Sequence, residues 1–195
     1  MAKTRFWKWY RTIPIMSMLL IAGLSLGFVR LPGALARQYL YPVSYEQAIL
    51  ESSERHGVDP LLVCAVIKCE SNWDSAAVSD AGAVGLMQLM PDTSSELAYY
   101  GYVDVWGYDP ENLTDPATNI EYGCAYLSQL QSQLGSTDEV IAAYNAGPGS
   151  VGEWLAEGGD IAEAIKFPET ALYLKRVNKT YERYQQLYTS TLSER

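Results

Sequence analysis

Glu70 is the residue whose type and place best suit proton-transfer chemistry. It lies eight residues after Leu62 and four after Val66, so on a helix it shares a flank with an apolar stripe. It also falls in the last turn of that helix. Apolar surroundings and the negative end of a helix dipole both disfavour a carboxylate, so both raise the pKa of the group. A raised pKa suits a general acid at a glycosidic oxygen, although periodicity alone fits a solvated glutamate at a helix end better.

A glycine-rich segment follows, from Ser79 to Pro91. Gly82 and Gly85 permit backbone geometries and close approaches that other residues do not. Gln88 carries an amide that both donates and accepts hydrogen bonds, which suits sugar hydroxyls and N-acetyl groups. The segment lacks the Lys and Ser/Thr of a phosphate-binding loop, and by itself it also fits a tight turn between two helices.

Three short motifs occur in order along the chain. They are Glu70-Ser71, Gly85-Leu86-Met87-Gln88 and Ala143-Tyr144-Asn145-Ala146-Gly147. In this order they resemble the motifs of the soluble lytic transglycosylases, a family of lysozyme-like glycosidases related in fold to goose-type lysozyme. The resemblance extends over Tyr45–Tyr188 and implies a mainly α, lysozyme-like single catalytic domain.

The resemblance also implies a role for each matching residue. Glu70 corresponds to the single catalytic glutamate, which protonates the oxygen between N-acetylmuramic acid and N-acetylglucosamine. It then accepts the proton of the muramic C6 hydroxyl as that oxygen attacks C1, which leaves a 1,6-anhydro end and consumes no water. The positions expected to bind substrate are Ser79, Gly85, Met87, Gln88, Tyr144, Asn145 and Tyr173. Without the resemblance, the tyrosines read as core residues and the asparagine as a helix stop.

Two other functions fit the same residues. A hydrolase resembling goose-type lysozyme needs a second carboxylate, and Asp74, Asp80 and Asp92 are available by position. None of these aspartates falls in a motif that marks a catalytic residue. The other alternative is an inactive domain that only grips wall glycans, and the presence of Glu70 argues against it.

Short amphipathic helices are predicted around these motifs. Ser44 to Gln47 has the pattern of a capping box, and Gly57 ends the helix that follows. Asp59-Pro60 starts the next helix. One face of that helix is expected to hold Leu61, Leu62, Ala65, Val66 and Cys69.

The second half of the chain gives three further helices. Asp115-Pro116 opens one that runs to Gly135, and a shorter one ends at Asn145 before Gly147. The last helix begins at Pro168, and its expected inner face holds Leu172, Val177, Tyr184 and Leu187. Few stretches alternate with period two, so the domain is expected to be mainly α.

The first 37 residues differ from the rest of the chain. They carry six basic groups and no acid, and Ile13–Val29 is an uncharged apolar run of 17 residues, near the lower limit for a membrane span. A basic flank held in the cytoplasm puts everything after Arg30 outside. We expect an uncleaved single-pass anchor; the alternative is a signal peptide cut near Ala36, after which the protein is secreted.

Charge and length limit the remaining possibilities. We expect an N-terminal anchor or signal segment (1–37), a catalytic domain (43–188) and a short tail (189–195). Residues 38–195 hold eight basic and 23 acidic groups, a formal charge of 8 − 23 = −15, which would repel nucleic acid. The expected partners are peptidoglycan glycan strands and, through the N-terminal segment, the membrane.

The three cysteines leave two possibilities open. Outside the cytoplasm, either Cys64 or Cys69 can pair with Cys124 across a helix contact, while buried reduced thiols fit at least as well. The single histidine, His56, fits a cation at a helix C-terminus, and no metal-ligand spacing occurs. Neither a metal nor a cofactor is expected.

Overall fold

The computed structural model describes residues 33–192 and divides the chain into two compact units, Met1–Pro42 and Val43–Arg195. The described part of the first unit holds a short helical turn, α2 (Gly33–Leu35), and a π-helical turn (Ala36–Leu40). The apolar run Ile13–Val29 lies outside the described residues. Within residues 33–192, no helix is both long and apolar enough to cross a membrane.

The second unit is built from helices, as the sequence predicts. They are α3 (Glu46–His56), α4 (Pro60–Glu70), α5 (Pro91–Tyr99), α6 (Pro116–Gln133), α7 (Thr137–Ala146), α8 (Pro148–Ala156), α9 (Ile161–Ala164) and α10 (Pro168–Leu192). Between α4 and α5, Val84 forms isolated antiparallel bridges to Val78 and Leu89. These bridges are the only β pairing in the described part of the chain.

Side-chain caps start helices α4 and α6. The carboxylates of Asp59 and Asp115 accept hydrogen bonds from backbone N–H groups of α4 and α6, with Pro at the next position in each case. Gly57 ends α3 in the left-handed conformation, as predicted. The predicted capping box at Ser44 is wrong: Tyr45 is the N-cap of α3, at φ 56°, and its side chain makes no capping hydrogen bond.

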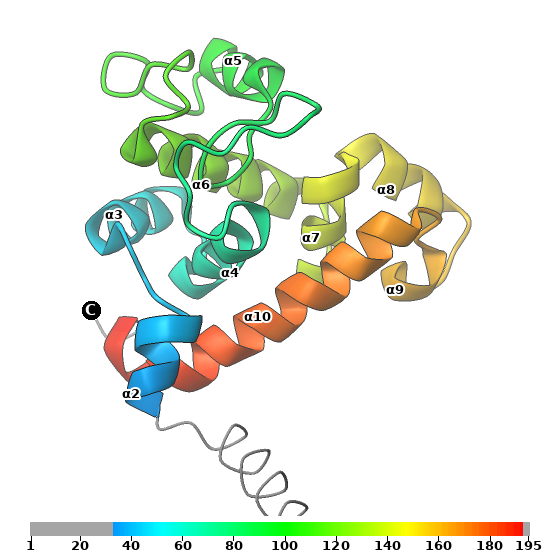
Figure 1. Cartoon of the computed structure of the whole chain (residues 1–195). Helices are drawn as coiled ribbons and strands as arrows, with labels where there is room; N and C mark the ends of the chain where they lie inside the picture. The colour runs from blue at the N-terminus through cyan, green and yellow to red at the C-terminus, as the bar shows by residue number, and fades with distance from the viewer. Residues whose placement is uncertain (1–32, 193–195) are drawn as a thin grey trace, which may run out of the picture. The chain divides into compact units, whose positions relative to one another are not determined.

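Helix α4 is the centre of the unit. Every residue from Leu61 to Ile67 is buried, so the prediction of a single apolar face was too narrow. Helices α3 and α10 pack against it (Figure 1). A helix covered on several sides has no polar face, and this fixes the position of its last residue, Glu70.

Helix α10 is the long element that closes the unit against α4 and α7. Val177, Tyr184 and Leu187 lie on its buried face as predicted, together with Tyr173 and Leu174. Leu172, predicted to be buried, is 68% exposed. Its place is one residue off the buried stripe, which the i, i+4 pairs from Thr170 to Leu174 and from Tyr173 to Val177 define.

Three short helices of the second unit were not predicted, namely α5, α8 and α9. Helix α5 begins at Pro91, directly after the glycine-rich segment, and α8 begins at Pro148. The sequence around Gly147-Pro148 was interpreted only as a stop. It both ends α7 and starts α8, because Pro is well accommodated at the first helical position.

The glycine-rich segment is fastened to α6 by one buried amide. Asn119 accepts a hydrogen bond from Met87 N at 2.7 Å, and its Nδ2 donates to the carbonyls of Val84 and Leu113 at 2.9 Å each. Gly85 lies against this amide at φ +81°, where a Cβ atom would come within 2.3 Å of the Asn119 Nδ2. The segment can therefore dock only with glycine at this position.

A buried charged cluster joins α3 to α6. The side chain of Glu121 is only 2% exposed, and its two oxygens contact Arg55 and His56 at 3.0 Å each and Ser52 at 2.5 Å. Burial alone would raise the pKa of this carboxyl, but the three partners together lower it to about 2. Glu121 is therefore ionised at neutral pH.

The three cysteines are free thiols. Cys64 and Cys124 are fully buried, and burial raises the pKa of each thiol well above its ordinary value. Cys69 is partly exposed, and its Sγ lies 3.5 Å from the hydroxyl of Thr180. Of the two possibilities left by the sequence, the structure therefore has the reduced form.

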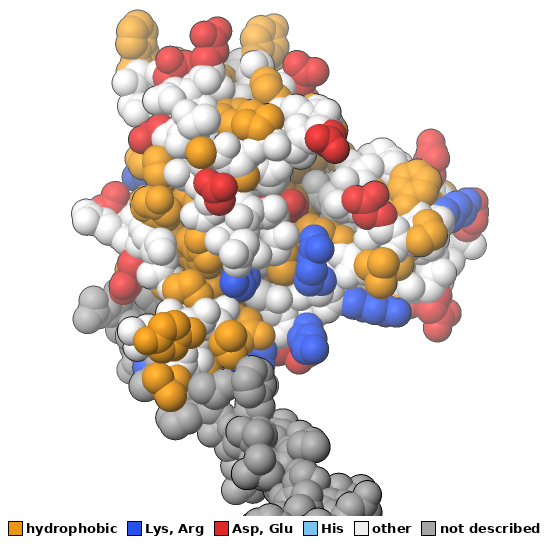
Figure 2. All heavy atoms as spheres, in the orientation of Figure 1, with side chains coloured by type: hydrophobic (Ala, Val, Ile, Leu, Met, Phe, Trp, Pro, Cys, Tyr) orange, Lys and Arg blue, Asp and Glu red, His pale blue; other side chains and the backbone are white. Residues whose placement is uncertain are grey.

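Charge is unevenly distributed over the surface. On the face shown in Figure 2, acidic side chains are scattered widely, whereas Lys and Arg side chains gather over α10. The sequence explains the contrast, since no Lys, Arg or His occurs between Lys68 and Lys166.

The Glu121 cluster predicts acid sensitivity. A carboxyl whose pKa falls from 4.5 to about 2 on folding contributes stability above pH 4.5 that is lost as the pH falls toward 2. The contribution is on the order of 3 kcal/mol. Glu121→Gln should lower the free energy of unfolding by at least that amount at pH 7, because it also leaves Arg55 and His56 unpaired. Urea unfolding at several pH values should show the difference from wild type shrinking below pH 4.5. The exposed control, Glu111→Gln, should show none, and a difference independent of pH would contradict the account.

The docking of Gly85 predicts a contrast between two glycines. Gly85 and Gly82 both have positive φ, but a Cβ at Gly82 would meet nothing within 4 Å. Gly82→Ala should therefore lose only the left-handed backbone preference, about 1 kcal/mol. Gly85→Ala adds overpacking against Asn119 and should lose about 3 kcal/mol in all. Thermal unfolding of the two variants tests this, and equal losses would show that the close approach is unimportant.

Candidate active site

Glu70 ends α4 where that helix meets α10. The Tyr173 hydroxyl donates a hydrogen bond to its Oε1 at 2.6 Å. Burial raises the pKa of Glu70 above its usual value, while the Tyr173 hydrogen bond and the positive charge of Arg176 partly offset that rise. Burial therefore favours the protonated carboxyl, and the two partners favour the carboxylate.

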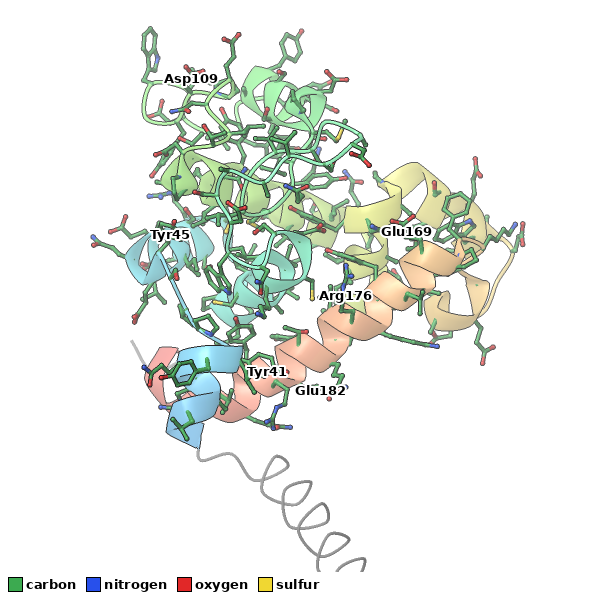
Figure 3. All side chains as sticks on the ribbon, viewed as in Figure 1. Tyr41, Tyr45, Asp109, Glu169, Arg176 and Glu182 are labelled. Atoms are coloured by element: carbon green, nitrogen blue, oxygen red, sulfur yellow. The ribbon has the colours of Figure 1, made fainter. Side chains whose placement is uncertain are left out.

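Arg176 lies one turn after Tyr173 on α10. Its guanidinium carbon is 5.5 Å from the centre of the Tyr173 ring, within the range of a cation–π contact. Figure 3 labels Arg176 on α10 beside the end of α4. It also interacts with the Cys69 thiol, whose pKa is raised mainly by burial. Arg176 is therefore the positive charge that acts on both Glu70 and its neighbour.

The backbone after Glu70 is held in an unusual conformation. Asn72 and Trp73 both have positive φ, at 53° and 72°, which is a rare state for a bulky side chain. Two contacts hold this turn: Ser71 Oγ donates to the Leu86 carbonyl at 2.8 Å, and Trp73 Nε1 donates to the Tyr184 hydroxyl at 3.3 Å. The turn carries the chain away from the Glu70 carboxyl and ties it to the glycine-rich segment.

Tyr144 joins α7 to that segment. Its hydroxyl donates to the Met87 carbonyl at 2.8 Å, and its ring lies 5.3 Å from that of Tyr126. Burial raises the pKa of Tyr144, and the charge of nearby Glu70 raises it further. Tyr144 is therefore a neutral hydroxyl close to Glu70, and its hydrogen bond supports the backbone of the glycine-rich segment at Met87.

Met87 and Gly85 take part in the site through their backbone carbonyls, which bind Tyr144 and Gln88. Both are buried, and a Cβ on Gly123 of α6 would come within 2.1 Å of the Met87 sulfur. The sequence predicts a substrate contact for the Met87 side chain, but the structure places that side chain in the core. Its carbonyl instead positions Tyr144.

Two amides of the site have one end fixed. The Gln88 Nε2 donates to the carbonyls of Ala77 and Gly85 at 3.1 and 3.0 Å, and Gln88 itself has φ 49°. The Asn145 Oδ1 accepts a hydrogen bond from the Thr170 hydroxyl at 2.8 Å. One end of each amide is anchored, so the other end has a defined direction.

Ser79 lies at the base of the glycine-rich turn. Its Oγ accepts a hydrogen bond from Ala83 N at 3.0 Å, and its backbone N–H donates to the Ala83 carbonyl. Ser79 is half-buried, and its hydroxyl shapes the turn between Asp80 and Gly82.

The three aspartates considered as second carboxylates are all exposed. Asp74 Oδ1 accepts a hydrogen bond from Ala76 N at 2.9 Å, which forms a local turn. Asp92 lies in the first turn of α5. The groups that shift the pKa of Glu70 are Tyr173 and Arg176, with no acidic side chain of the described region among them.

Sequence reasoning missed Arg176 and Asn119. From its place on the helix, Arg176 is expected to be an ordinary surface cation. Only the contacts of Tyr173, which binds Glu70 and lies beside Arg176, show that the Arg176 charge is near Glu70. Asn119 lies three residues after Pro116 on α6, and its position on the buried face was the available signal. A buried asparagine on a helix needs partners for its amide, and here these come from the glycine-rich segment.

Comparison with known proteins identifies this arrangement. A family model described as the transglycosylase SLT domain matches residues 47–167. The soluble lytic murein transglycosylase of Escherichia coli is 33% identical over 156 residues, covering 76% of this chain and 24% of that protein. The membrane-bound lytic murein transglycosylase C of Edwardsiella ictaluri is 34% identical over 169 residues, covering 73% of this chain and 47% of that protein.

Solved structures agree with the sequence matches. An inactive mutant of the lytic transglycosylase Slt from Pseudomonas aeruginosa matches with a TM-score of 0.70 at 33% identity, over 77% of this chain and 25% of that one. The 70 kDa soluble lytic transglycosylase of Escherichia coli matches with a TM-score of 0.68 at 31% identity, over 75% of this chain and 25% of that one. These matches confirm the expected mainly α, lysozyme-like fold. The chain spans about a quarter of the length of the soluble relatives and about half that of the membrane-bound one. It belongs to the transglycosylase SLT domain family.

Proposed function

We propose that residues 43–188 form a catalytic domain that cleaves the β-1,4 bond between N-acetylmuramic acid and N-acetylglucosamine in peptidoglycan. The cleavage leaves 1,6-anhydromuramic acid ends. The observation that carries the proposal is the half-buried carboxyl of Glu70, held by the Tyr173 hydroxyl with no second acid acting on it. The matched relatives are named lytic murein transglycosylases, which supports the same reaction here.

Glu70 acts first as an acid. Burial raises its pKa, which favours the protonated carboxyl that a general acid requires. Because Tyr173 donates to Oε1, the proton belongs on Oε2, from which it passes to the bridging oxygen as the bond to C1 breaks. The leaving N-acetylglucosamine end departs as a neutral hydroxyl.

Glu70 then acts as a base. The carboxylate left by the first step is stabilised by the Tyr173 hydrogen bond and by the charge of Arg176, both of which lower its pKa. It takes the proton of the muramic C6 hydroxyl while that oxygen forms a bond to C1. One group thus serves both steps, and no water is consumed.

The absence of a second acid favours transglycosylation over hydrolysis. Hydrolases of this kind use a second carboxylate to hold water or to attack C1. Asp74, Asp80 and Asp92 are exposed, and none acts on the pKa of Glu70. The C6 hydroxyl belongs to the same bound ring, so its effective concentration exceeds that of water by orders of magnitude.

A purely glycan-binding domain would have no use for this carboxyl. Burying an ionisable acid at a helix C-terminus lowers stability at neutral pH, and glutamine would fill the same space without that cost. One matched relative was solved as an inactive mutant in which glutamate is replaced by glutamine. That description supports a catalytic role for the buried glutamate here.

The fixed amides are suited to hold the sugar. With its Nε2 bound to two carbonyls, Gln88 can present Oε1 to an N-acetyl N–H or a hydroxyl. Asn145, whose Oδ1 is bound to Thr170, can present its Nδ2 to a carbonyl or hydroxyl. We assign both side chains to substrate binding, with the Tyr144 ring beside them and Ser79, Gly85 and Met87 shaping the opposing turn.

Product analysis tests the reaction. Wall material digested in heavy-oxygen water should release muramic ends that are lighter by one water than reducing ends and carry no label. Mass spectrometry distinguishes the two products. Labelled reducing ends would make the enzyme a lysozyme and direct attention to Asp74, Asp80 and Asp92.

The matched control is Glu70→Gln, which keeps the shape and the acceptor for Tyr173 but carries no proton to transfer. Its turnover should fall by about 10²–10⁴-fold or more. Its stability at pH 7 should not fall, since the ionised form that burial disfavours is gone. Glu182→Gln, an exposed change on α10, should keep full activity. Near wild-type turnover in Glu70→Gln would refute the assignment.

We also propose that the domain works outside the cytoplasm, tethered by residues 1–37. The support is the uncharged run Ile13–Val29, which follows a basic N-terminal segment, together with the substrate that the domain would act on. The alternative is secretion after cleavage near Ala36.

Fractionation and external protease test the location. The protein should sediment with membranes, and external protease should degrade the domain while the N-terminus stays protected. Mature soluble protein beginning at Arg37 would support the signal-peptide alternative. Recovery in the cytosol would overturn both, because the enzyme would be separated from the wall.

A further inference from the structure

Four basic residues share one flank of α10. Lys175, Arg176, Lys179 and Arg183 fall within about 100° of one another around a helix of 3.6 residues per turn. The first three are exposed and Arg183 is half-buried. We call these four residues the basic flank. Lys175 and Lys179 have no ion-pair partner among residues 33–192, so their charges are available to a ligand.

The flank stands out because the rest of the domain is acidic. Between Lys68 and Lys166 the chain has no basic residue and 16 acidic ones. On α10 itself, Glu182 is the one acid between Lys175 and Arg183, which leaves that stretch with a net charge of 4 − 1 = +3. Lys and Arg gather over α10 in Figure 2 in the same way. An anionic group is therefore attracted to α10 and repelled elsewhere.

The flank begins at the proposed catalytic acid. Arg176 lies over the ring of Tyr173, at 5.5 Å, and the hydroxyl of Tyr173 is 2.6 Å from Glu70. From Arg176 the flank continues seven residues to Arg183, about 10 Å along the helix axis. A polymer whose scissile bond sits at Glu70 passes within reach of these cations if it follows α10.

We propose that the basic flank is a subsite for carboxylate groups carried by the glycan strand, namely those of the attached peptides and those of muramic lactyl groups that carry no peptide. This inference rests on the proposed function and names the part of the substrate that the flank selects. N-acetylmuramic acid carries its lactyl group on the ring next to the scissile bond. The lactyl carboxylate, or the peptide joined to it through an amide bond, is therefore held on the ring that binds beside Glu70. A flat anionic membrane is a poorer fit, since it would also face the acidic remainder of the surface.

Binding can be measured without cleavage in the Glu70→Gln background. Soluble glycan fragments with peptide stems are titrated against Glu70→Gln alone and with Lys175→Gln, Lys179→Gln or both. Exposed charge pairs contribute modestly, so the double change should weaken binding about three- to ten-fold at low salt. Added salt should remove the difference. The matched control is Lys166→Gln, which removes an exposed lysine already paired with Glu157 and should change little.

A second ligand isolates the carboxylates. Fragments whose carboxyl groups have been converted to amides should bind the flank variants and the parent equally. If the double variant binds both ligands as the parent does, the flank proposal fails while the cleavage reaction stands. Loss of binding to phosphatidylglycerol vesicles with unchanged fragment binding would assign the flank to a membrane and also overturn it.

Turnover separates this proposal from the proposed function. In the Glu70 protein, Lys175→Gln/Lys179→Gln should raise KM on stem-bearing wall fragments by a similar factor and leave kcat unchanged. A fall in kcat without a change in KM would show that the lysines do not act in binding. If the Glu70 protein releases no fragment from any wall material, the proposed function fails. The binding comparison of stem-bearing and amidated fragments still decides the role of the flank.

Discussion

The contact between Tyr173 and Glu70 depends on most of the domain. It joins the ends of two segments, α4 and α10, that are about 100 residues apart in sequence. Helix α4 must be buried on several sides to carry its last side chain out of water, and α10 must be long enough to close over it. The result is a carboxyl in which burial and two stabilising partners oppose each other. A group that must give up a proton and then take one back requires such a balance.

Two buried glutamates show how the environment decides the state of one side chain. The pKa of Glu70 is raised, with one hydroxyl and one neighbouring cation to offset burial. The pKa of Glu121 is lowered to about 2, because Arg55, His56 and Ser52 all bind it directly. The first is suited to proton exchange and the second to holding α3 against α6. Neither role can be read from the residue type alone.

The sequence predicts the helical fold and the position of Glu70 because both depend on local patterns. Asp-Pro starts and a glycine stop are local signals, and the structure has both of them. The orientation of Arg176 and the partners of Glu121 depend on contacts between distant helices, which no local pattern encodes. The place of the Met87 side chain depends on packing in the same way: its motif marks its importance, and only the contact with Gly123 shows that the side chain lies in the core. Helices α5 and α8 were missed because no helix start was assigned to Pro91 and Pro148 was interpreted only as part of a stop.

The absence of basic residues between Lys68 and Lys166 determines where proteases can cut the domain. Exposed loops are where proteases usually nick a folded chain, and this stretch includes the turn after Glu70 and the long connection from Tyr100 to Asp115. Trypsin-like proteases cut only after Lys or Arg, so they find no cleavage site in either loop. Complete tryptic digestion would release residues 69–166 as one fragment that holds Glu70, the glycine-rich segment and Tyr144 together. Trypsin-like proteases at a cell surface would therefore leave this stretch of the chain uncut, whether or not α10 stays folded against it.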